Sequence, residues 1–431
     1  MDARFNLFFS HIDVDALSLT ASEVQHLKQQ SIDHQYPGTI LHDFQVLLDF
    51  LTPNGTNVSS ANNFLPMKSL AELNQRVSHP IAITLKRPQQ KSFPYIHGLY
   101  LLLRTSGLTL VQAKGKKQRL VLDDVVLNAW HQLNLTEQYF NLLEAWLLWS
   151  NDAALGDYQD PLGTFHRCTH FWSRIPEEGL VFANLTEQDT WLYHIKPHHA
   201  ALLDLFGFIT TQPGPVEKSW RIASLKKKPF GTAMMKVLVQ AFIEHSDRFQ
   251  SQTQFDFSYG ALQPVFQDYF PQWQQNLVIP GGEFEESVYI FKVSILKVWR
   301  RIAIPNTLTL DNLSETILDA FNFDRDHLYQ FSHKDRFGVL QTVIHPEINR
   351  PPHTNETLIG DLPLAPGASM TYLYDFGDRW KFQVQFEKMA PSDPKLGQPQ
   401  VLATQGEAPQ QYWDENSWDG EWDAGDWNDY D

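Results

Sequence analysis

The sequence contains almost no cysteine and no long apolar run. Cys168 is the single cysteine among 431 residues, so no intramolecular disulfide can form, which is typical of proteins in a reducing compartment. No stretch approaches the roughly 20 apolar residues that span a bilayer. Residues 1–5 do not open a signal peptide, because no basic region, apolar run and cleavage site follow them. We therefore expect a cytoplasmic protein with no membrane segment.

Basic residues are also scarce. The chain has 34 Lys and Arg against 50 Asp and Glu, a formal net charge of −16. Residues 412–431 hold eight of the carboxylates, four tryptophans and no basic residue, so this tail carries half of the net charge. The rest of the chain is only mildly acidic, which disfavours nonspecific nucleic-acid binding over the whole surface but leaves room for a local basic patch.

The apolar content of 42% is that of a globular protein, and the length suits two or three domains. Residues 40–51 have the apolar spacing of an amphipathic helix, and the turn-rich residues 52–63 predict an exposed loop. Residues 280–283, Pro-Gly-Gly-Glu, predict a linker. We expect an α+β protein with these segments: a helical segment with an exposed loop at 1–79, a helical region at 80–279, a small α+β domain at 284–390, and a Pro/Gln-rich then acidic, disordered tail at 391–431.

The region 80–279 repeats one order of elements. A predicted helix at 95–104 is followed by a hairpin that turns at 114–117 and by a further helix from Asp123 or Asp124. A second helix at 198–205 precedes a hairpin around Pro213-Gly214-Pro215 and a helix that begins near Pro229. Helix, hairpin and helix is the order of a winged helix, in which the hairpin is the wing. The sequence therefore predicts two winged-helix-like units.

Basic residues lie at or beside both predicted wings, where phosphate contacts are made in winged-helix proteins that bind DNA. The candidate DNA contacts are Lys114, Lys116, Lys117, Arg119, Lys226, Lys227 and Lys228. The alternative is that these lysines lie in solvated turns, and winged helices also bind proteins. The predicted partner is therefore a protein or DNA.

The region 284–390 is rich in predicted strands. A helix with Leu313, Ile317 and Phe321 on one face, capped by Thr309, separates two strands from the later ones. The strands are expected at 288–296, 299–304, 329–332, 339–344, 371–374 and 381–386. This order resembles a β-grasp arrangement.

Three motifs in this region occur together in one known family. They are Trp299-Arg300-Arg301-Ile302, then His327-Leu328-Tyr329-Gln330-Phe331, then Tyr374-Asp375-Phe376-Gly377-Asp378 with Trp380 and Glu387. In their order and spacing, residues 288–388 resemble the plasmid-Ri ORF-three-like family, also described as an insertion-sequence passenger protein. The resemblance implies a module linked to mobile elements and implies no activity.

Two departures separate this chain from the family pattern. Phe382 stands where the family usually has a histidine, and the family's Cys- and Pro-rich segment is reduced to residues 406–409. A metal site or reaction that needed that histidine or cysteine would be lost here.

Two groups of residues are candidates for chemistry. Asp375 and Asp378 flank a turn; they would stabilise it, pair with Arg300 or Arg301, or form a carboxylate pair for a metal. His166, Cys168 and His170 would share one face of a strand, but no second ligand pair at zinc spacing accompanies them. A buried thiol among aromatic residues is the favoured interpretation.

These observations predict a non-enzymatic binding or regulatory protein with no catalytic residue, metal or cofactor. It would recognise a protein or DNA through the winged-helix-like region and the C-terminal module, with the acidic tail as an interaction or autoinhibitory segment. The alternative is a metal-dependent enzyme with a carboxylate site around Asp375 and Asp378.

Overall fold

The computed structural model describes residues 17–59, 63–114, 117–157, 163–244, 258–279, 286–335, 339–349, 352–364, 366–391 and 397–412, without the side chains of residues 113–117. The predicted linker at 280–283, the acidic tail and the wing residue Lys116 lie outside the described residues, as do the side chains of Lys114 and Lys117. Contacts divide the chain into an N-terminal unit, Met1–Gly281 with Arg336–Val339, and a C-terminal unit, Gly282–Asp335 with Leu340–Asp431.

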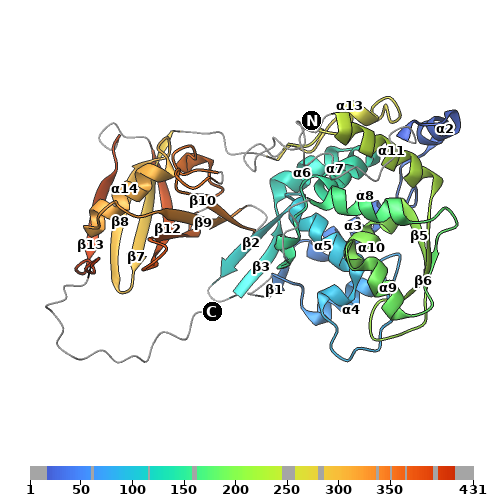
Figure 1. The fold of residues 1–431 in the computed structure, drawn as a ribbon, viewed down its shortest axis with the longest axis horizontal. Helices are drawn as coiled ribbons and strands as arrows, with labels where there is room; N and C mark the ends of the chain where they lie inside the picture. The colour runs from blue at the N-terminus through green and yellow to red at the C-terminus, as the bar shows by residue number, and fades with distance from the viewer. Residues whose placement is uncertain are drawn as a thin grey trace. The chain divides into compact units, whose positions relative to one another are not determined.

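Both units combine helices with antiparallel sheets, which confirms the predicted α+β class (Figure 1). None of the helices in the described ranges is both long and apolar enough to cross a membrane.

The first half of the N-terminal unit is a run of helices closed by a hairpin. Its elements are α3 (Ile40–Leu51), β1 (Thr56–Val58), α4 (Met67–Arg76), α5 (Pro94–Thr105), β2 (Thr109–Lys114) and β3 (Lys117–Leu122). Strand β3 lies between β1 and β2 in a three-stranded antiparallel sheet. The predicted exposed loop at 52–63 is therefore wrong in part: β1 lies within it, and its pairing partner is some sixty residues further along the chain.

The second half repeats this order. Its elements are α8 (Gly163–Arg174), β4 (Leu180–Val181), α9 (Leu185–Leu192), α10 (Pro197–Leu205), β5 (Ile209–Pro213) and β6 (Ile222–Lys227). Strand β6 lies between β4 and β5, so both sheets have the same order, first strand, third strand, second strand.

Further helices surround these two halves: α2 (Ala21–Gln29), α6 (Asp124–Gln132), α7 (Leu135–Leu147), α11 (Pro229–Glu244) and α13 (Gln263–Phe266). Helix α6 begins at Asp124, in agreement with the predicted start at Asp123 or Asp124, and Asp123 caps it. Helix α7 begins at Leu135 and is capped by Asn134, in a capping box with Glu137.

Helices α5 and α10 pack against each other in the centre of the N-terminal unit (Figure 1). Every residue of α5 is buried, and so is every residue of α10 from His198 to Leu205. Gly98 allows the close approach, because a Cβ there would lie 2.8 Å from Leu202 Cγ and 3.0 Å from the His198 carbonyl oxygen. The two helices therefore form a shared interior and present no free face.

The C-terminal unit is one seven-stranded sheet with one long helix. Its elements are β7 (Ser287–Ile295), β8 (Val298–Pro305), α14 (Leu310–Phe321), β9 (Tyr329–Lys334), β10 (Leu340–Ile344), β11 (Ser369–Tyr374), β12 (Trp380–Pro391) and β13 (Gln400–Gln405). The order across the sheet is β10-β9-β11-β12-β7-β8-β13, and every neighbouring pair is antiparallel.

Helix α14 packs on one face of this sheet. Thr309 caps it, as predicted, in a capping box with Asn312. Its apolar residues Leu313, Ile317 and Phe321 join a core with inward-facing residues of β7, β8, β11 and β12. Period-two alternation leaves the other residues of these strands on the opposite face of the sheet.

Candidate functional site

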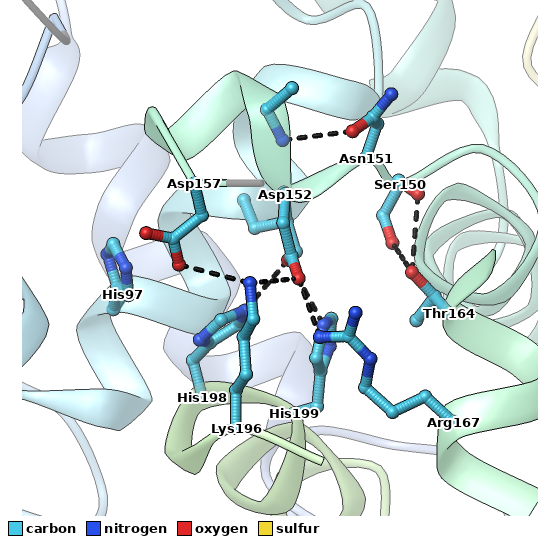
Figure 2. A network of polar contacts seen from close by, with 12 residues as sticks. His97, Ser150, Asn151, Asp152, Asp157, Thr164, Arg167, Lys196, His198 and His199 are labelled. Atoms are coloured by element: carbon cyan, nitrogen blue, oxygen red, sulfur yellow. Dashed lines mark hydrogen bonds and ion pairs between the residues drawn. The ribbon is translucent and has the colours of Figure 1, made fainter. Parts of the chain in front are cut away.

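The described residues contain one group of three potential metal ligands close together, and it lies in the N-terminal unit. Asp152, His198 and His199 are buried, and their ligand atoms lie within 4.8 Å of one another. Asp152 Oδ1 is 3.1 Å from Nε2 of both histidines. Its Oδ2 is 2.8 Å from Arg167 and 2.8 Å from Lys196 Nζ, so one carboxylate has four nitrogen neighbours (Figure 2).

Three separate elements bring these side chains together. Asp152 opens the short 3-10 helix η3 (Asp152–Leu155), which Asn151 caps, between α7 and α8. Arg167 comes from α8, and His198 and His199 stand in the first turn of α10 after Pro197. The partial positive charge at a helix N-terminus also favours a carboxylate at this place. The cluster therefore ties the segment between the two halves of the N-terminal unit to α8 and α10 of the second half.

The hydrogen bonds determine the tautomer of His199. Trp146 Nε1 donates to His199 Nδ1 at 3.0 Å, so the ring proton of neutral His199 resides on Nε2, which donates to Asp152. Burial, reinforced by the neighbouring His198, lowers the pKa of His199 to about 4. Burial by itself would raise the pKa of Asp152, but the two histidines outweigh it and hold that pKa well below its usual range.

This arrangement is poorly suited to a metal ion. A metal at Nε2 of His199 would have to displace the proton there while Trp146 keeps Nδ1 occupied. The Asp152 carboxylate already faces the two cations Arg167 and Lys196, so a divalent cation would add uncompensated positive charge to a buried site. The chemistry of these donors therefore supports a buried, charge-paired structural centre.

Neither Asp152 nor the pair His198 and His199 was singled out from the sequence as functional. The carboxylate and the histidines are 46 and 47 residues apart, so spacing alone gives no signal. Two adjacent histidines after a proline at the start of a helix were the one local hint.

The predicted grouping of His166, Cys168 and His170 on a strand is wrong, because these residues lie on α8. Residues four apart share a helix face, and the His166 and His170 rings are 6.3 Å apart. Cys168 is fully buried, and burial raises the pKa of its thiol well above the usual range. The three side chains do not form a ligand set.

Two other buried carboxylates of the N-terminal unit, Glu144 and Glu137, accept hydrogen bonds from backbone N–H groups. Glu144 accepts N–H groups from Gly260 at 2.6 Å and Leu262 at 2.7 Å. Glu137 accepts N–H groups from Gln274 at 3.0 Å and Gln275 at 2.8 Å. These acids tie the segment after α11 to α7, so their hydrogen-bonding capacity is already used inside the fold.

In the C-terminal unit, the motif residues Trp299, Arg300 and Arg301 lie on β8. The predicted pairing of either arginine with Asp375 or Asp378 is wrong. Arg301 forms two hydrogen bonds with Glu387, at 2.7 and 2.9 Å, because both lie on the outward face of the sheet, on the strands β8 and β12 that flank β7. Arg300 lies on the inner face, where it donates to the Ala320 carbonyl at 2.9 Å near the end of α14.

The motif residues His327, Tyr374 and Asp375 meet at one end of the sheet. Asp375 Oδ1 accepts the Gly377 N–H at 2.8 Å, which stabilises the turn, and its Oδ2 is 3.5 Å from His327 Nε2. The Tyr374 hydroxyl accepts the N–H groups of Asp326 and His327 at 3.1 and 3.3 Å. These residues connect loops at this end of the unit.

The remaining motif residues divide between surface and core. Asp378 is exposed in the turn. The Trp380 ring packs edge-on against Phe323, with centroids 5.0 Å apart. Phe382, which replaces the family's histidine, is fully buried in the core, where an apolar ring is the residue expected.

Four of the seven predicted DNA contacts have described side chains. Arg119 donates to the Asn54 carbonyl at 2.6 Å, and Lys228 donates to the Pro37 carbonyl at 2.6 Å. Lys227 Nζ lies 5.5 Å from the centre of the Trp172 ring and 3.7 Å from Glu177, and Lys226 is exposed. Three of these four side chains therefore have partners within the chain.

Comparisons with known proteins find relatives for the C-terminal unit. Residues 288–414 match the family described as plasmid pRiA4b ORF-3-like protein. A 115-residue stretch, 26% of this chain, is 30% identical to the uncharacterized protein y4hQ of Sinorhizobium fredii (strain NBRC 101917 / NGR234), and the chain covers 57% of that protein.

A solved structure, the protein of unknown function MM3350 from Methanosarcina mazei Go1, is 26% identical over 29% of this chain and 72% of its own, with a TM-score of 0.27. The family match confirms the resemblance predicted from the motifs between residues 288 and 388. The C-terminal unit thus carries a module of the plasmid pRiA4b ORF-3-like family.

Proposed function

We propose that the protein is a non-enzymatic, cytoplasmic binding protein whose partner is another protein, and that its N-terminal unit consists of two winged helices. The element order supports this fold. Each half runs helix, short strand, two helices and a hairpin, and in each sheet the last strand lies between the other two. In a winged helix with this order, α5 and α10 are the recognition helices and the β2–β3 and β5–β6 hairpins are the wings.

The burial of α5 and α10 carries the choice of partner. A recognition helix reads DNA by placing exposed side chains in the major groove. Here both helices are buried and pack on each other through Gly98 and Leu202. Groove reading would require the two halves to separate and would expose the buried apolar residues of both helices. The pair therefore serves as a scaffold, and the surfaces left for partners are its outer faces and the C-terminal module.

The carboxylates that are candidates for catalysis already bind other parts of the chain, which supports a non-enzymatic protein. Asp152 is paired with cations, Glu144 and Glu137 bind backbone, and Asp375 stabilises its turn. The metal-dependent alternative around Asp375 and Asp378 is not favoured by this geometry. The β-grasp assignment for the C-terminal unit stays a prediction. In the sheet of this unit every pair of neighbouring strands is antiparallel.

DNA contact through the wings is the second candidate, favoured by one observation. Lys226 is exposed on the second wing, and the first wing carries three lysines at or beside its turn. Such contacts would reach phosphates without reading bases.

The experiment is fluorescence anisotropy with labelled duplex DNA over a salt series, for the full chain and for a chain that ends at Tyr412. Tyr412 is chosen because Gln411 and Tyr412 still hydrogen-bond Asp324 and Asp326. Protein binding as the function predicts no salt-sensitive DNA binding by either chain. Salt-sensitive binding that appears without the tail and is lost in Lys226→Glu would establish the wing candidate and overturn the first. Lys68→Glu, on the exposed surface of α4, is the matched control.

A further inference from the structure

Part of the face of the C-terminal sheet opposite α14 carries basic and polar side chains around one tryptophan, beside the buried Val288, Ile290 and Ala303. We call the residues Lys292, Trp299, Arg301, Lys381, Gln383 and Lys388 the open face. Strand register places them on one side, because Lys292 is opposite Arg301, Ser294 is opposite Trp299, and Gln383 is opposite Ser294. Each is half-buried or exposed, in contrast to the buried residues that alternate with them under α14.

The charge of the open face is positive. Four of its six residues are basic, and the neighbouring carboxylate of Glu387 is already paired with Arg301. The adjoining turns add exposed Lys297 and Arg379 beside Asp375 and Asp378. A chain with an excess of acidic residues therefore gathers cations on this one surface, which favours an anionic ligand.

The tryptophan adds a second kind of contact. Lys292 Nζ and the Arg301 guanidinium carbon both lie 5.2 Å from the centre of the Trp299 ring, within the range of cation–π attraction. This arrangement orders the two cations on the surface of the sheet. Carboxylates and aromatic rings are the groups that bind such cations.

The acidic tail of the chain begins after Tyr412, at the end of the sheet where the β11–β12 hairpin turns. The Tyr412 hydroxyl donates to both Asp326 oxygens, at 3.0 and 2.9 Å, and the Asp326 N–H donates to the Tyr374 hydroxyl. Tyr374 is opposite Trp380 across the β11–β12 hairpin, one residue before Lys381. The nineteen residues after Tyr412 reach up to about 60 Å when extended, whereas seven strands at their usual spacing span about 29 Å.

We propose that the open face binds the chain's own tail, residues 413–431, which carries eight carboxylates and four tryptophans without a basic residue. The tail carboxylates pair with Lys292, Lys381 and Lys388, and its indole rings pack on the lysine and arginine side chains. Any external ligand of the open face must then displace the tail, so the tail is an intramolecular competitor. The open face lies outside the proposed winged-helix scaffold, so the experiment on one surface does not decide the role of the other.

The test uses a fluorescein-labelled peptide of residues 413–431 and two proteins, the full chain and the chain that ends at Tyr412. Anisotropy should show saturable binding to the shortened chain that weakens roughly tenfold or more between low and high salt, as expected for exposed charge pairs. The full chain should bind the peptide about tenfold more weakly, because its own tail has a high effective concentration at the site.

Two variants of the shortened chain locate the site. Lys292→Glu with Lys381→Glu should weaken peptide binding about tenfold or more, since two attractive contacts become repulsive. Lys226→Glu, on the second wing, should leave it unchanged, and circular dichroism establishes that each variant is folded. The proposal is overturned if the shortened chain does not bind the peptide, if the full chain binds it equally well, or if the wing substitution has the larger effect.

Discussion

The two units of this protein use charged side chains in opposite ways. In the N-terminal unit, Asp152 is buried with Arg167 and Lys196 as counterions, and its hydrogen bonds connect three elements. In the C-terminal unit, Arg301 and Glu387 form an equally well-aligned pair on a half-exposed sheet surface. The first pair is enclosed and can act only on the fold, whereas the second lies where a ligand can reach it. Similar ionic contacts therefore indicate structure in one unit and binding in the other.

The largest expected effect comes from removing the buried carboxylate. Asp152→Ala removes the buried carboxylate that Arg167 contacts at 2.8 Å, and we expect a loss of about 3–5 kcal/mol in the free energy of unfolding of the N-terminal unit. Urea titration, monitored by amide hydrogen exchange in α10, measures this loss of stability. Asp157→Ala is the matched control, because Asp157 contacts the same Lys196 at 3.2 Å from a half-exposed position. Equal losses in both variants would contradict the distinction between the two units.

The same cluster predicts a pH dependence. Burial lowers the pKa of His199 to about 4 from an ordinary value near 6.5, so the native state favours the neutral ring. The stabilisation is complete above the ordinary value and is lost as the pH falls toward 4, by about 3 kcal/mol at most. The lowered pKa of Asp152 acts in the same direction at still lower pH.

Hydrogen exchange of α10 at several pH values between 7 and 4.5 measures this fall. His199→Gln keeps an acceptor for Trp146 and a donor for Asp152 but does not titrate, so its stability should depend less on pH. An unchanged pH dependence in that variant would assign the effect to other groups.

The packing of α5 on α10 predicts a smaller loss. Gly98→Val places a side chain where Leu202 Cγ and the His198 carbonyl already lie, within 3.0 Å of a Cβ. We expect a loss of about 2 kcal/mol from overpacking, measured by urea titration. In the Leu202→Ala background the same substitution should cost less, because space has been made for it. Additive losses would show that the two helices do not meet at Gly98.

The smallest effect is expected for the exposed pair. Arg301→Ala and Glu387→Ala should change the thermal stability of the C-terminal unit several-fold less than Asp152→Ala changes that of the N-terminal unit, because solvent screens the pair. Arg300→Ala is the matched comparison on the same strand. Arg300 is buried and donates to the carbonyl groups of Ala320, near the end of α14, and of Gly406, after β13, so its removal should cost more than that of Arg301.

Local chemistry in the sequence predicts much of the fold. The apolar spacing at 40–51, the helix start at Asp123 or Asp124, the Thr309 cap and the strands around Asp375 all correspond to observed elements. Strand β1 was missed because three residues in a turn-rich segment carry no periodic pattern, and its partner β3 is distant in the sequence.

The functional surfaces were harder to predict, for a physical reason. The four nitrogen neighbours of Asp152 come from positions between 15 and 47 residues away, and Glu387 reaches Arg301 across a sheet. Only the fold determines which charges are enclosed and which face solvent. Motif recognition located Trp299, Arg301 and Glu387 but did not reveal that they share a face, and it paired the arginines with the wrong acids.

The measurement that tests the central claim most directly is selection of binding sites from a random duplex DNA library by the chain that ends at Tyr412. With α5 and α10 buried against each other, neither helix can read bases, so no sequence motif should be enriched over the starting library. Enrichment of a defined motif would contradict the account if substitutions in α5 or α10 abolish the binding while the exposed wing residues stay intact. It would show that the two halves separate and that their recognition helices read DNA.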